Sequence, residues 1–209
     1  MSTRPRKHPL ATYHHGDLKR ALLTAVEDIV RDKGIEALTL REAARRAGVS
    51  HGAPLHHFRD KRGLLTAFAV AGSRKLERCV RRALAGIDPR DHAARLTAVG
   101  MGYLDFALRH GAHFRIVFRP ELLDGADPDL EQARAAAGHT LDEVLMAARD
   151  AGSLSPNDYD RVRLASWSIA HGFASLAAEG AFGPVPRAVL RERAAIAFAL
   201  FSRRVLRPD

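Results

Sequence analysis

The sequence predicts an all-α protein of about nine helices, in which short helices near the N-terminus precede a larger bundle of longer ones. Apolar residues recur every three or four positions through most of the chain, which is the spacing of one helix face. Capping residues followed by proline begin several of these segments, and glycines follow where the periodicity stops. Alternating β-branched or aromatic runs of strand length are absent from the sequence.

The N-terminal part has the pattern of a helix-turn-helix. Apolar spacing predicts a first helix over residues 15–33. Thr39 and Glu42 have the spacing of a capping box, which begins a second, short helix. This helix must stop at Gly48, and Ser50 is the next N-cap candidate. Only about three residues then separate two short helices, as in a helix-turn-helix.

Longer helices are expected beyond residue 60, and six are predicted there. Their predicted starts include Asp88-Pro89, Asp127-Pro128 and Ser155-Pro156. Their predicted ends include Gly86, Gly111, Gly152 and Gly180. The predicted organisation is a basic arm over residues 1–14, a helix-turn-helix domain over 15–62 and a larger helical domain over 63–209.

The charge of the chain is concentrated in its first third. Residues 1–75 carry a net charge of +8 out of +9 for the whole chain. Such a block is typical of a module that binds nucleic acid or another polyanion, although an evenly solvated basic surface is the alternative. The longest apolar run, residues 194–201, is far shorter than the roughly 20 residues of a membrane span. With one cysteine and no secretion signal, a cytoplasmic protein without contact to a membrane is expected.

The predicted helix-turn-helix divides into an inner and an outer set of side chains. Ala44 is the small residue that faces the neighbouring helix. Leu40, Ala43, Val49 and Phe58 are placed to fill the small core. The outer set, suited to phosphate and base contacts, is Arg41, Arg45, Arg46, His51, His56 and His57. A purely structural helix pair is the alternative.

The segment from Leu38 to Ala53, followed by His57-Phe58-Arg59-Asp60-Lys61 and Leu64-Leu65, resembles the DNA-binding domain of the TetR family of bacterial transcriptional regulators. The resemblance covers about residues 15–65. It implies a homodimer that binds a DNA operator and a C-terminal domain that binds an effector. It also implies that Thr39 and Lys61 contact phosphate, and that the recognition helix carries Ser50, His51, Ala53, Pro54, Leu55 and His56.

Two residues depart from the family pattern. Leu55 stands where the family usually has a tyrosine, so the phosphate contact of that phenol is lost. Pro54 replaces an aliphatic residue, and with Ser50 as N-cap it should distort the first turn because it cannot donate to the Ser50 carbonyl. The Pro54 ring could offer an apolar contact to a thymine methyl, or be a tolerated irregularity.

The segment Trp167 to Leu176 resembles the Trp-His-Gly motif of one class of TetR-family C-terminal domains. Trp167 and His171 share a helix face. Two stripes are expected on the last two helices, and the resemblance implies that they form a dimer interface; intramolecular core is the alternative. The stripes consist of Ala165, Ser168, Gly172 and Ser175, and of Ala194, Ala197, Phe198, Phe201 and Val205.

A small-molecule site is expected among the central helices, where much of the aromatic content lies. Ordinary core is the alternative for each single residue. The candidates for effector binding are Met101, Tyr103, Leu104, Phe106, Phe114, Phe118, Leu145, Met146, Trp167 and His171.

An enzyme is not expected. His110, His113, His92 and His139 form no recognisable metal motif, so neither a metal nor a cofactor is predicted. Cys79 stands among arginines that could lower its pKa, but an inert cysteine is expected. The predicted function is a transcriptional repressor that binds a palindromic operator as a homodimer and is released by an effector. The alternative is a helical scaffold whose basic end binds acidic partners without reading DNA sequence.

Overall fold

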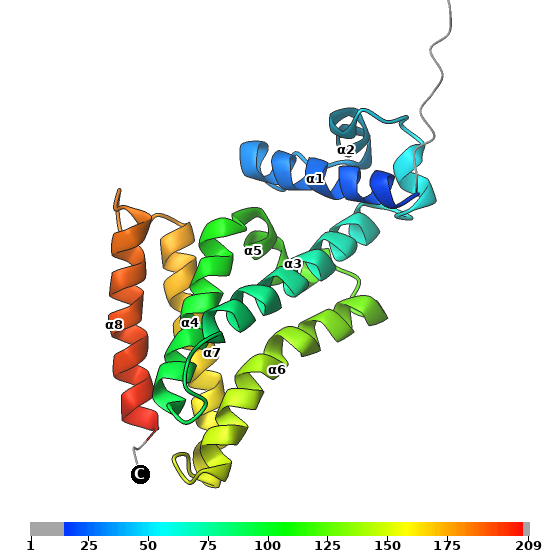
Figure 1. Cartoon of the computed structure of the whole chain (residues 1–209). Helices are drawn as coiled ribbons and strands as arrows, with labels where there is room; N and C mark the ends of the chain where they lie inside the picture. The colour runs from blue at the N-terminus through cyan, green and yellow to red at the C-terminus, as the bar shows by residue number, and fades with distance from the viewer. Residues whose placement is uncertain (1–14, 207–209) are drawn as a thin grey trace, which may run out of the picture. The chain divides into compact units, whose positions relative to one another are not determined.

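The computed structural model describes residues 15–206, with side chains from residue 18 onward, so the predicted arm over residues 1–14 lies outside the described residues. The described part is all-α, as the sequence predicted, with eight α-helices in place of about nine (Figure 1). They are α1 (His15–Lys33), α2 (Leu40–Ala47), α3 (Lys61–Leu84), α4 (His92–Arg109), α5 (Gly111–Val117), α6 (Pro128–Asp150), α7 (Tyr159–Ala178) and α8 (Arg187–Val205). Three short 3-10 helices are η1 (Ala53–His56), η2 (Pro120–Leu122) and η3 (Pro156–Asp158).

The chain divides into two compact units between Leu64 and Leu65. In the first unit α1 packs on α2, and α2 packs on η1. Ala43 and Ala44 are fully buried, as the helix-turn-helix pattern requires. Gly48 ends α2 in the left-handed region at φ 69°, a conformation that a side chain would disfavour.

The recognition segment differs from the expected α-helix. It is the four-residue 3-10 helix η1, whose N-cap is Gly52 and not Ser50. Pro54 therefore lies in the first turn, where the missing N–H has no partner to lose. The distortion predicted for Pro54 thus takes the form of a later start and a tighter helix, and the Pro54 carbonyl accepts from the N–H groups of His57 and Phe58 at 3.0 and 2.8 Å.

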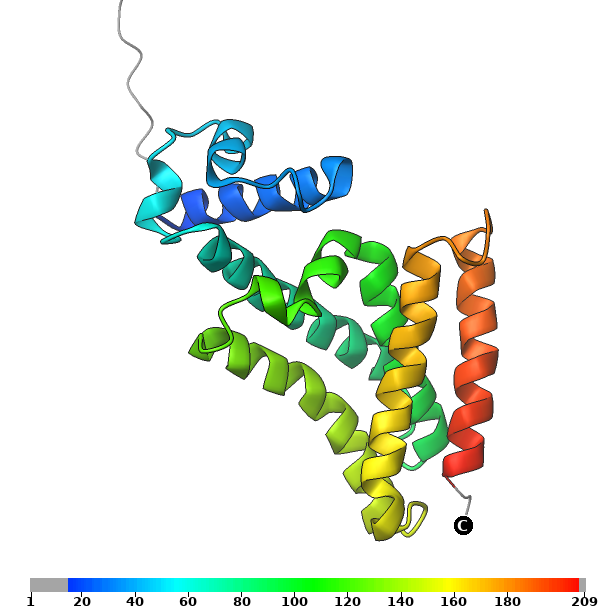
Figure 2. The ribbon, with the colours of Figure 1, turned by 180° about the vertical axis from the view of Figure 1, so that it is seen from behind.

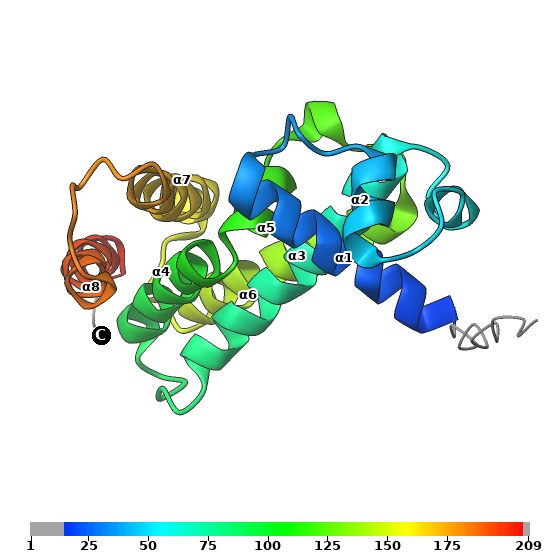
Figure 3. The ribbon, with the colours of Figure 1, turned by 90° about the horizontal axis from the view of Figure 1, so that it is seen from above.

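In the second unit α4 is the central helix, and it packs against α5, α6, α7 and α8. Helices α7 and α8 run antiparallel and side by side (Figure 2), and Figure 3 views them nearly end-on. Glycines allow the close approach of α4 to its neighbours. A Cβ on Gly102 would lie 2.5 Å from the Val80 Cα on α3, and one on Gly100 would lie 2.7 Å from the Phe198 ring on α8.

The helix boundaries follow local signals with two exceptions. Asp127 caps α6 by accepting from the Leu130 N–H at 2.9 Å, as predicted. The first exception is α4, which begins after Asp91 and not at Asp88-Pro89. Gly111 is the second, because it begins α5 instead of ending a helix. No helix within the described residues is both long and apolar enough to cross a membrane.

Candidate functional site

The first candidate site is the exposed edge of the helix-turn-helix. Thr39 is the N-cap of α2, and its hydroxyl accepts from the Glu42 N–H at 3.0 Å. Thr39 and Arg41 are both exposed at the start of this helix. A hydroxyl and a guanidinium beside a helix N-terminus can hold a phosphate group.

Of the four cations around this edge, two form ion pairs within the described part of the unit and two do not. Arg45 donates to Glu42 at 2.6 and 2.7 Å, which holds the pKa of that carboxyl at about 2, and Arg46 pairs with Asp32. By contrast, Arg41 and Lys61 form no ion pair with any residue of the described chain. Of the outward arginines predicted from the sequence, Arg45 and Arg46 are therefore held by Glu42 and Asp32, and Arg41 is not held by a carboxylate of the described residues.

Lys61 is the first residue of α3. The preceding Asp60 accepts from the Gly63 N–H at 2.8 Å, so the helix begins with an ordered turn. The half-buried Lys61 thus adds its charge to the positive end of a helix, where an anion is stabilised.

The residues predicted for base contact are not equally accessible. Ser50, His51, Leu55 and His56 are exposed, and Ala53 is half-buried. Pro54 is buried, so the suggested contact of its ring with a thymine methyl is wrong. Leu55 is 57% exposed, which is unusual for a large apolar side chain and leaves it free to contact a partner.

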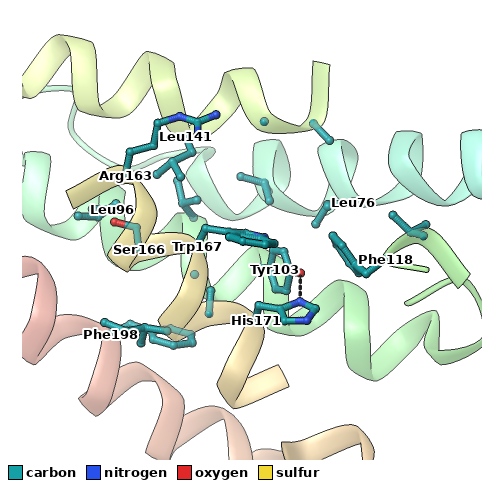
Figure 4. Close-up of a pocket in the computed structure, with 18 of the residues that line it drawn as sticks. Leu76, Leu96, Tyr103, Phe118, Leu141, Arg163, Ser166, Trp167, His171 and Phe198 are labelled. Atoms are coloured by element: carbon teal, nitrogen blue, oxygen red, sulfur yellow. Dashed lines mark hydrogen bonds between the residues drawn. The ribbon is translucent and has the colours of Figure 1, made fainter. Parts of the chain in front are cut away.

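The second candidate site is a cavity of about 670 Å³ in the second unit, lined from α3 to α8 (Figure 4). Its walls are mostly apolar, and its aromatic groups include Tyr103, Phe118 and Trp167. A volume of this size with few polar groups is typical of a small-molecule site.

A buried hydrogen bond joins two walls of this cavity. The Tyr103 hydroxyl on α4 lies 2.7 Å from Nδ1 of His171 on α7 (Figure 4). Burial lowers the pKa of His171 and raises that of Tyr103, and a hydrogen bond with the Trp167 side chain partly offsets the latter shift. Which of the two groups donates in the Tyr103–His171 bond is set by which ring nitrogen of His171 carries the proton. Burial therefore favours the neutral form of His171.

The structure brings together only part of the predicted effector set. Phe118, Trp167, His171 and Tyr103 line the cavity. The others do not line it: Leu104, Phe106, Phe114 and Leu145 are buried core, Met146 is half-buried, and Met101 lines a separate hollow of about 390 Å³. For these six residues the structure differs from the prediction, which placed them in the effector cavity. Sequence reasoning missed Arg134 and Ser73, which do line the cavity. The position of Arg134 could have been found from the sequence, because it shares one face of α6 with Ala137, Gly138 and Leu141.

Only some residues of the two predicted dimer stripes are exposed on the surface of the protomer. Ala194 and Phe198 are buried in the protomer, Phe201 lines the cavity, and Val205 packs on the core around Leu145. In the protomer these four pack within its own core or line the cavity. Ser168 is exposed, and Ala165, Gly172, Ser175 and Ala197 are half-buried. The large apolar side chains exposed on α7 and α8 are instead Leu164, Trp167, Leu176, Ile196 and Leu200.

Cys79 lines the same hollow as Met101 and is half-buried. Burial raises the pKa of its thiol, and this effect outweighs the opposing charges of Arg82, Arg109 and Arg78. The arginines lower the pKa as predicted, but burial has the larger effect and the net shift is upward. A thiol with a raised pKa is less reactive.

Comparisons with known proteins address both units. The family model described as bacterial regulatory proteins of the tetR family matches residues 19–68, and a tetracyclin repressor-like C-terminal domain matches residues 96–199. The chain belongs to the TetR family. This confirms the resemblance seen in the sequence, and with it the expectation of a DNA-binding transcriptional regulator in place of an enzyme.

Relatives of this TetR-family chain include the HTH-type transcriptional regulator BetI of Yersinia pestis, which is 37% identical over 87 residues. That match covers 42% of this chain and 44% of BetI, so the chain spans less than half the length of this curated relative. A solved protein of unknown function from Rhodococcus sp. RHA1 is 33% identical with a TM-score of 0.80, over 95% of this chain and 100% of that one. A tetR-family regulatory protein from Rhodococcus RHA1, 22% identical, shares the fold with a TM-score of 0.69 over 92% and 98% of the two chains.

Proposed function

We propose that this TetR-family chain is a transcriptional repressor that binds a palindromic operator as a homodimer and leaves it when a small, mainly apolar molecule fills the cavity. One observation carries the DNA-binding part. Arg41 and Lys61 have no ion-pair partner in the described chain, whereas the neighbouring Arg45 and Arg46 do. A cation without an internal partner is available to a phosphate group. Because bacterial DNA lies in the cytoplasm, the same proposal puts the protein there.

The exposed apolar side chains of α7 and α8 support a dimer. Leu164, Ile196 and Leu200 are 61, 65 and 74% exposed, although they lie on two adjacent helices. Side chains of this size at such exposure gain stability when a partner covers them. A second copy of the chain can cover them symmetrically, with the small residues Ser168 and Gly172 allowing close approach. A symmetric dimer presents two recognition segments, which suits a palindrome with half-sites about 34 Å apart.

The cavity supports release by an effector. A ligand can shift the protein toward a form that no longer fits DNA only if it binds that form more tightly. A coupling of about 1–3 kcal/mol is typical, which corresponds to roughly a 5- to 150-fold change in operator affinity. The reciprocal effect is that operator DNA weakens the binding of the effector by the same factor.

Operator binding can be tested with DNA fragments selected by the purified protein. The double variant Arg41→Ala, Lys61→Ala should weaken binding to all sequences and reduce the dependence of log affinity on log salt by about four units, because a dimer loses two cations in each protomer. Arg115→Ala, Arg119→Ala is the matched control, because it removes two exposed cations elsewhere. Undiminished binding by the first double variant would contradict the proposal that Arg41 and Lys61 contact DNA phosphates. A salt-dependent isotherm without sequence preference would favour the helical scaffold.

A further inference from the structure

The charged side chains in the cavity wall are all positive. Its lining contains two arginines, Arg134 and Arg163, and neither aspartate nor glutamate. His171 adds no charge, because burial lowers its pKa. A ligand in this space therefore meets a positive wall, which disfavours a cation and favours an anion.

Only one of the two arginines has a carboxylate partner among the described residues. Arg163 donates to both carboxylate oxygens of Asp142, at 2.5 and 3.4 Å, so its charge is balanced. Arg134 donates to the Val117 carbonyl at 3.1 Å and has no carboxylate partner in the described chain. A guanidinium has five N–H donors, so most of those of Arg134 remain for a ligand. The bond to Val117 also fixes the orientation of this group before any ligand binds.

A second polar group, without a partner among the described residues, lines the same cavity. Ser73 lines the cavity, is 1% exposed, and its hydroxyl has no hydrogen-bond partner in the described chain. Its neighbour Gly72 packs on Val117, since a Cβ there would lie 2.6 Å from a Val117 methyl carbon. Gly72 on α3 and Arg134 on α6 thus both lie against Val117, and Ser73 is the next residue after Gly72. A buried hydroxyl without a partner is costly, and a ligand oxygen would supply the missing acceptor.

The rest of the cavity is apolar over a substantial length. Arg134 and Asp142 are eight residues apart on α6, which separates the Arg134 end from the Arg163–Asp142 pair by about 12 Å at the rise of an α-helix. The apolar part of the wall includes Leu141, Trp167 and Leu96 (Figure 4). A ligand that satisfies both parts has an apolar body and an anionic group at one end.

We infer that the effector is an apolar carboxylate whose carboxyl group is held by Arg134, with Ser73 as a second donor, and whose body lies along Leu141 and Trp167. This inference rests on the proposed function, because it names the chemistry of the effector for the same cavity. A carboxylate accepts two N–H bonds from one guanidinium, which an alcohol cannot match.

The test compares ligands that differ only in the end group. The probes are decanoate, 1-decanol and decyltrimethylammonium, and the aromatic set 4-phenylbutyrate, 4-phenyl-1-butanol and 4-phenylbutyltrimethylammonium. Binding to the full chain without DNA is followed by calorimetry and by the fluorescence of Trp167, the only tryptophan of the chain. In at least one set the carboxylate should bind about 10- to 100-fold more tightly than the alcohol, because a hydrogen bond to a charged group is stronger than one to a neutral group.

Variants assign that preference to its residues. Arg134→Gln should reduce the carboxylate preference to less than about threefold and leave the alcohol affinity unchanged, whereas Arg134→Lys should keep most of it. Ser73→Ala should weaken the carboxylate severalfold without loss of stability, because the hydroxyl has no partner to lose. Arg119→Gln, an exposed arginine outside the cavity lining, is the matched control.

Three outcomes would overturn the inference: carboxylates that bind no more tightly than the alcohols or ammonium compounds, equal loss of carboxylate and alcohol affinity in Arg134→Gln, and no carboxylate binding at all. Failure of the proposed function has a different signature. Carboxylates that bind through Arg134 but leave operator affinity unchanged would refute effector release and leave this inference standing.

Discussion

Tyr103 on α4 and His171 on α7 are joined by a 2.7 Å hydrogen bond inside the wall of the cavity. The bond crosses between two helices that pack on each other, and Phe118 lies against both rings at centroid distances of 5.8 and 4.9 Å. The histidine of the Trp-His-Gly segment therefore has a defined structural role, which is to form a hydrogen bond with a buried phenol.

Removing the Tyr103 hydroxyl tests that role. Tyr103→Phe keeps the ring contacts but leaves His171 Nδ1 without its hydrogen-bond partner, so the free energy of unfolding should fall by about 1 kcal/mol or more. Urea denaturation measures this change. Tyr159→Phe is the matched control, because its hydroxyl bond to Asp142 is 3.3 Å long and half-exposed, and a smaller loss is expected. Equal losses in the two variants would contradict the role assigned to Tyr103.

The glycines of α4 lead to a second prediction. Gly102→Ala should lower the free energy of unfolding by about 1–3 kcal/mol, because the new methyl group would meet the backbone of Val80 and Cys79, which can move only with α3. Gly138→Ala is the control in the middle of α6, where the added methyl makes only ordinary contact at 3.9 Å. That change should stabilise the helix by about 0.5–1 kcal/mol. Thermal and urea unfolding of both variants would decide, and a neutral Gly102→Ala would show that the helices can separate freely.

The helix-turn-helix could be predicted because its signals are local. Thr39 caps α2 through a bond that spans three residues, and Gly48 supplies a left-handed turn that glycine adopts without strain. The recognition segment was less predictable. Whether Ser50 or Gly52 begins it depends on where Pro54 can be buried, and that is decided by packing and not by the local sequence.

The cavity could be predicted only in part, because periodicity identifies an apolar face without identifying what covers it. Phe106 and Phe118 are twelve residues apart in one aromatic segment, yet the first is core and the second lines the cavity. On α8, too, periodicity did not distinguish core residues from surface residues. Phe198 packs on Gly100, and Leu200, two residues later, is exposed.

The dimer proposal can be tested on the exposed face of α7 and α8. The double variant Ile196→Glu, Leu200→Glu should dissociate the dimer and weaken operator binding, because it would bury two charges without partners. Sedimentation of each variant measures the association. Ala147→Glu, an exposed position on α6, is the control and should stay dimeric. Phe201→Glu is unsuitable, since it would disturb the cavity and core. A double variant that sediments as the wild-type dimer does would reject the α7 and α8 interface.

The last prediction concerns His113, whose ring is 2% exposed and stacks on Phe68 with centroids 3.9 Å apart. Burial lowers the pKa of His113 to about 3, and the charges of Lys75 and His110 act in the same direction. In the unfolded chain a histidine has a pKa of about 6.5. The unfolded chain therefore binds this proton more readily, so its contribution to stability is complete above about pH 6.5 and falls as the pH drops from there toward 3.

Replacement of His113 by phenylalanine should remove this dependence, because the ring still stacks on Phe68 but no longer titrates. Between pH 7 and pH 5 the wild-type chain should lose about 2 kcal/mol more unfolding free energy than His113→Phe, since the unfolded histidine gains its proton over this interval. Urea unfolding at both pH values and constant salt measures the difference. His139→Gln removes an exposed histidine and should lose stability as the wild type does. If His113→Phe proves as acid-sensitive as the wild type, the loss of stability in acid arises from other groups and His113 is not held neutral by its burial.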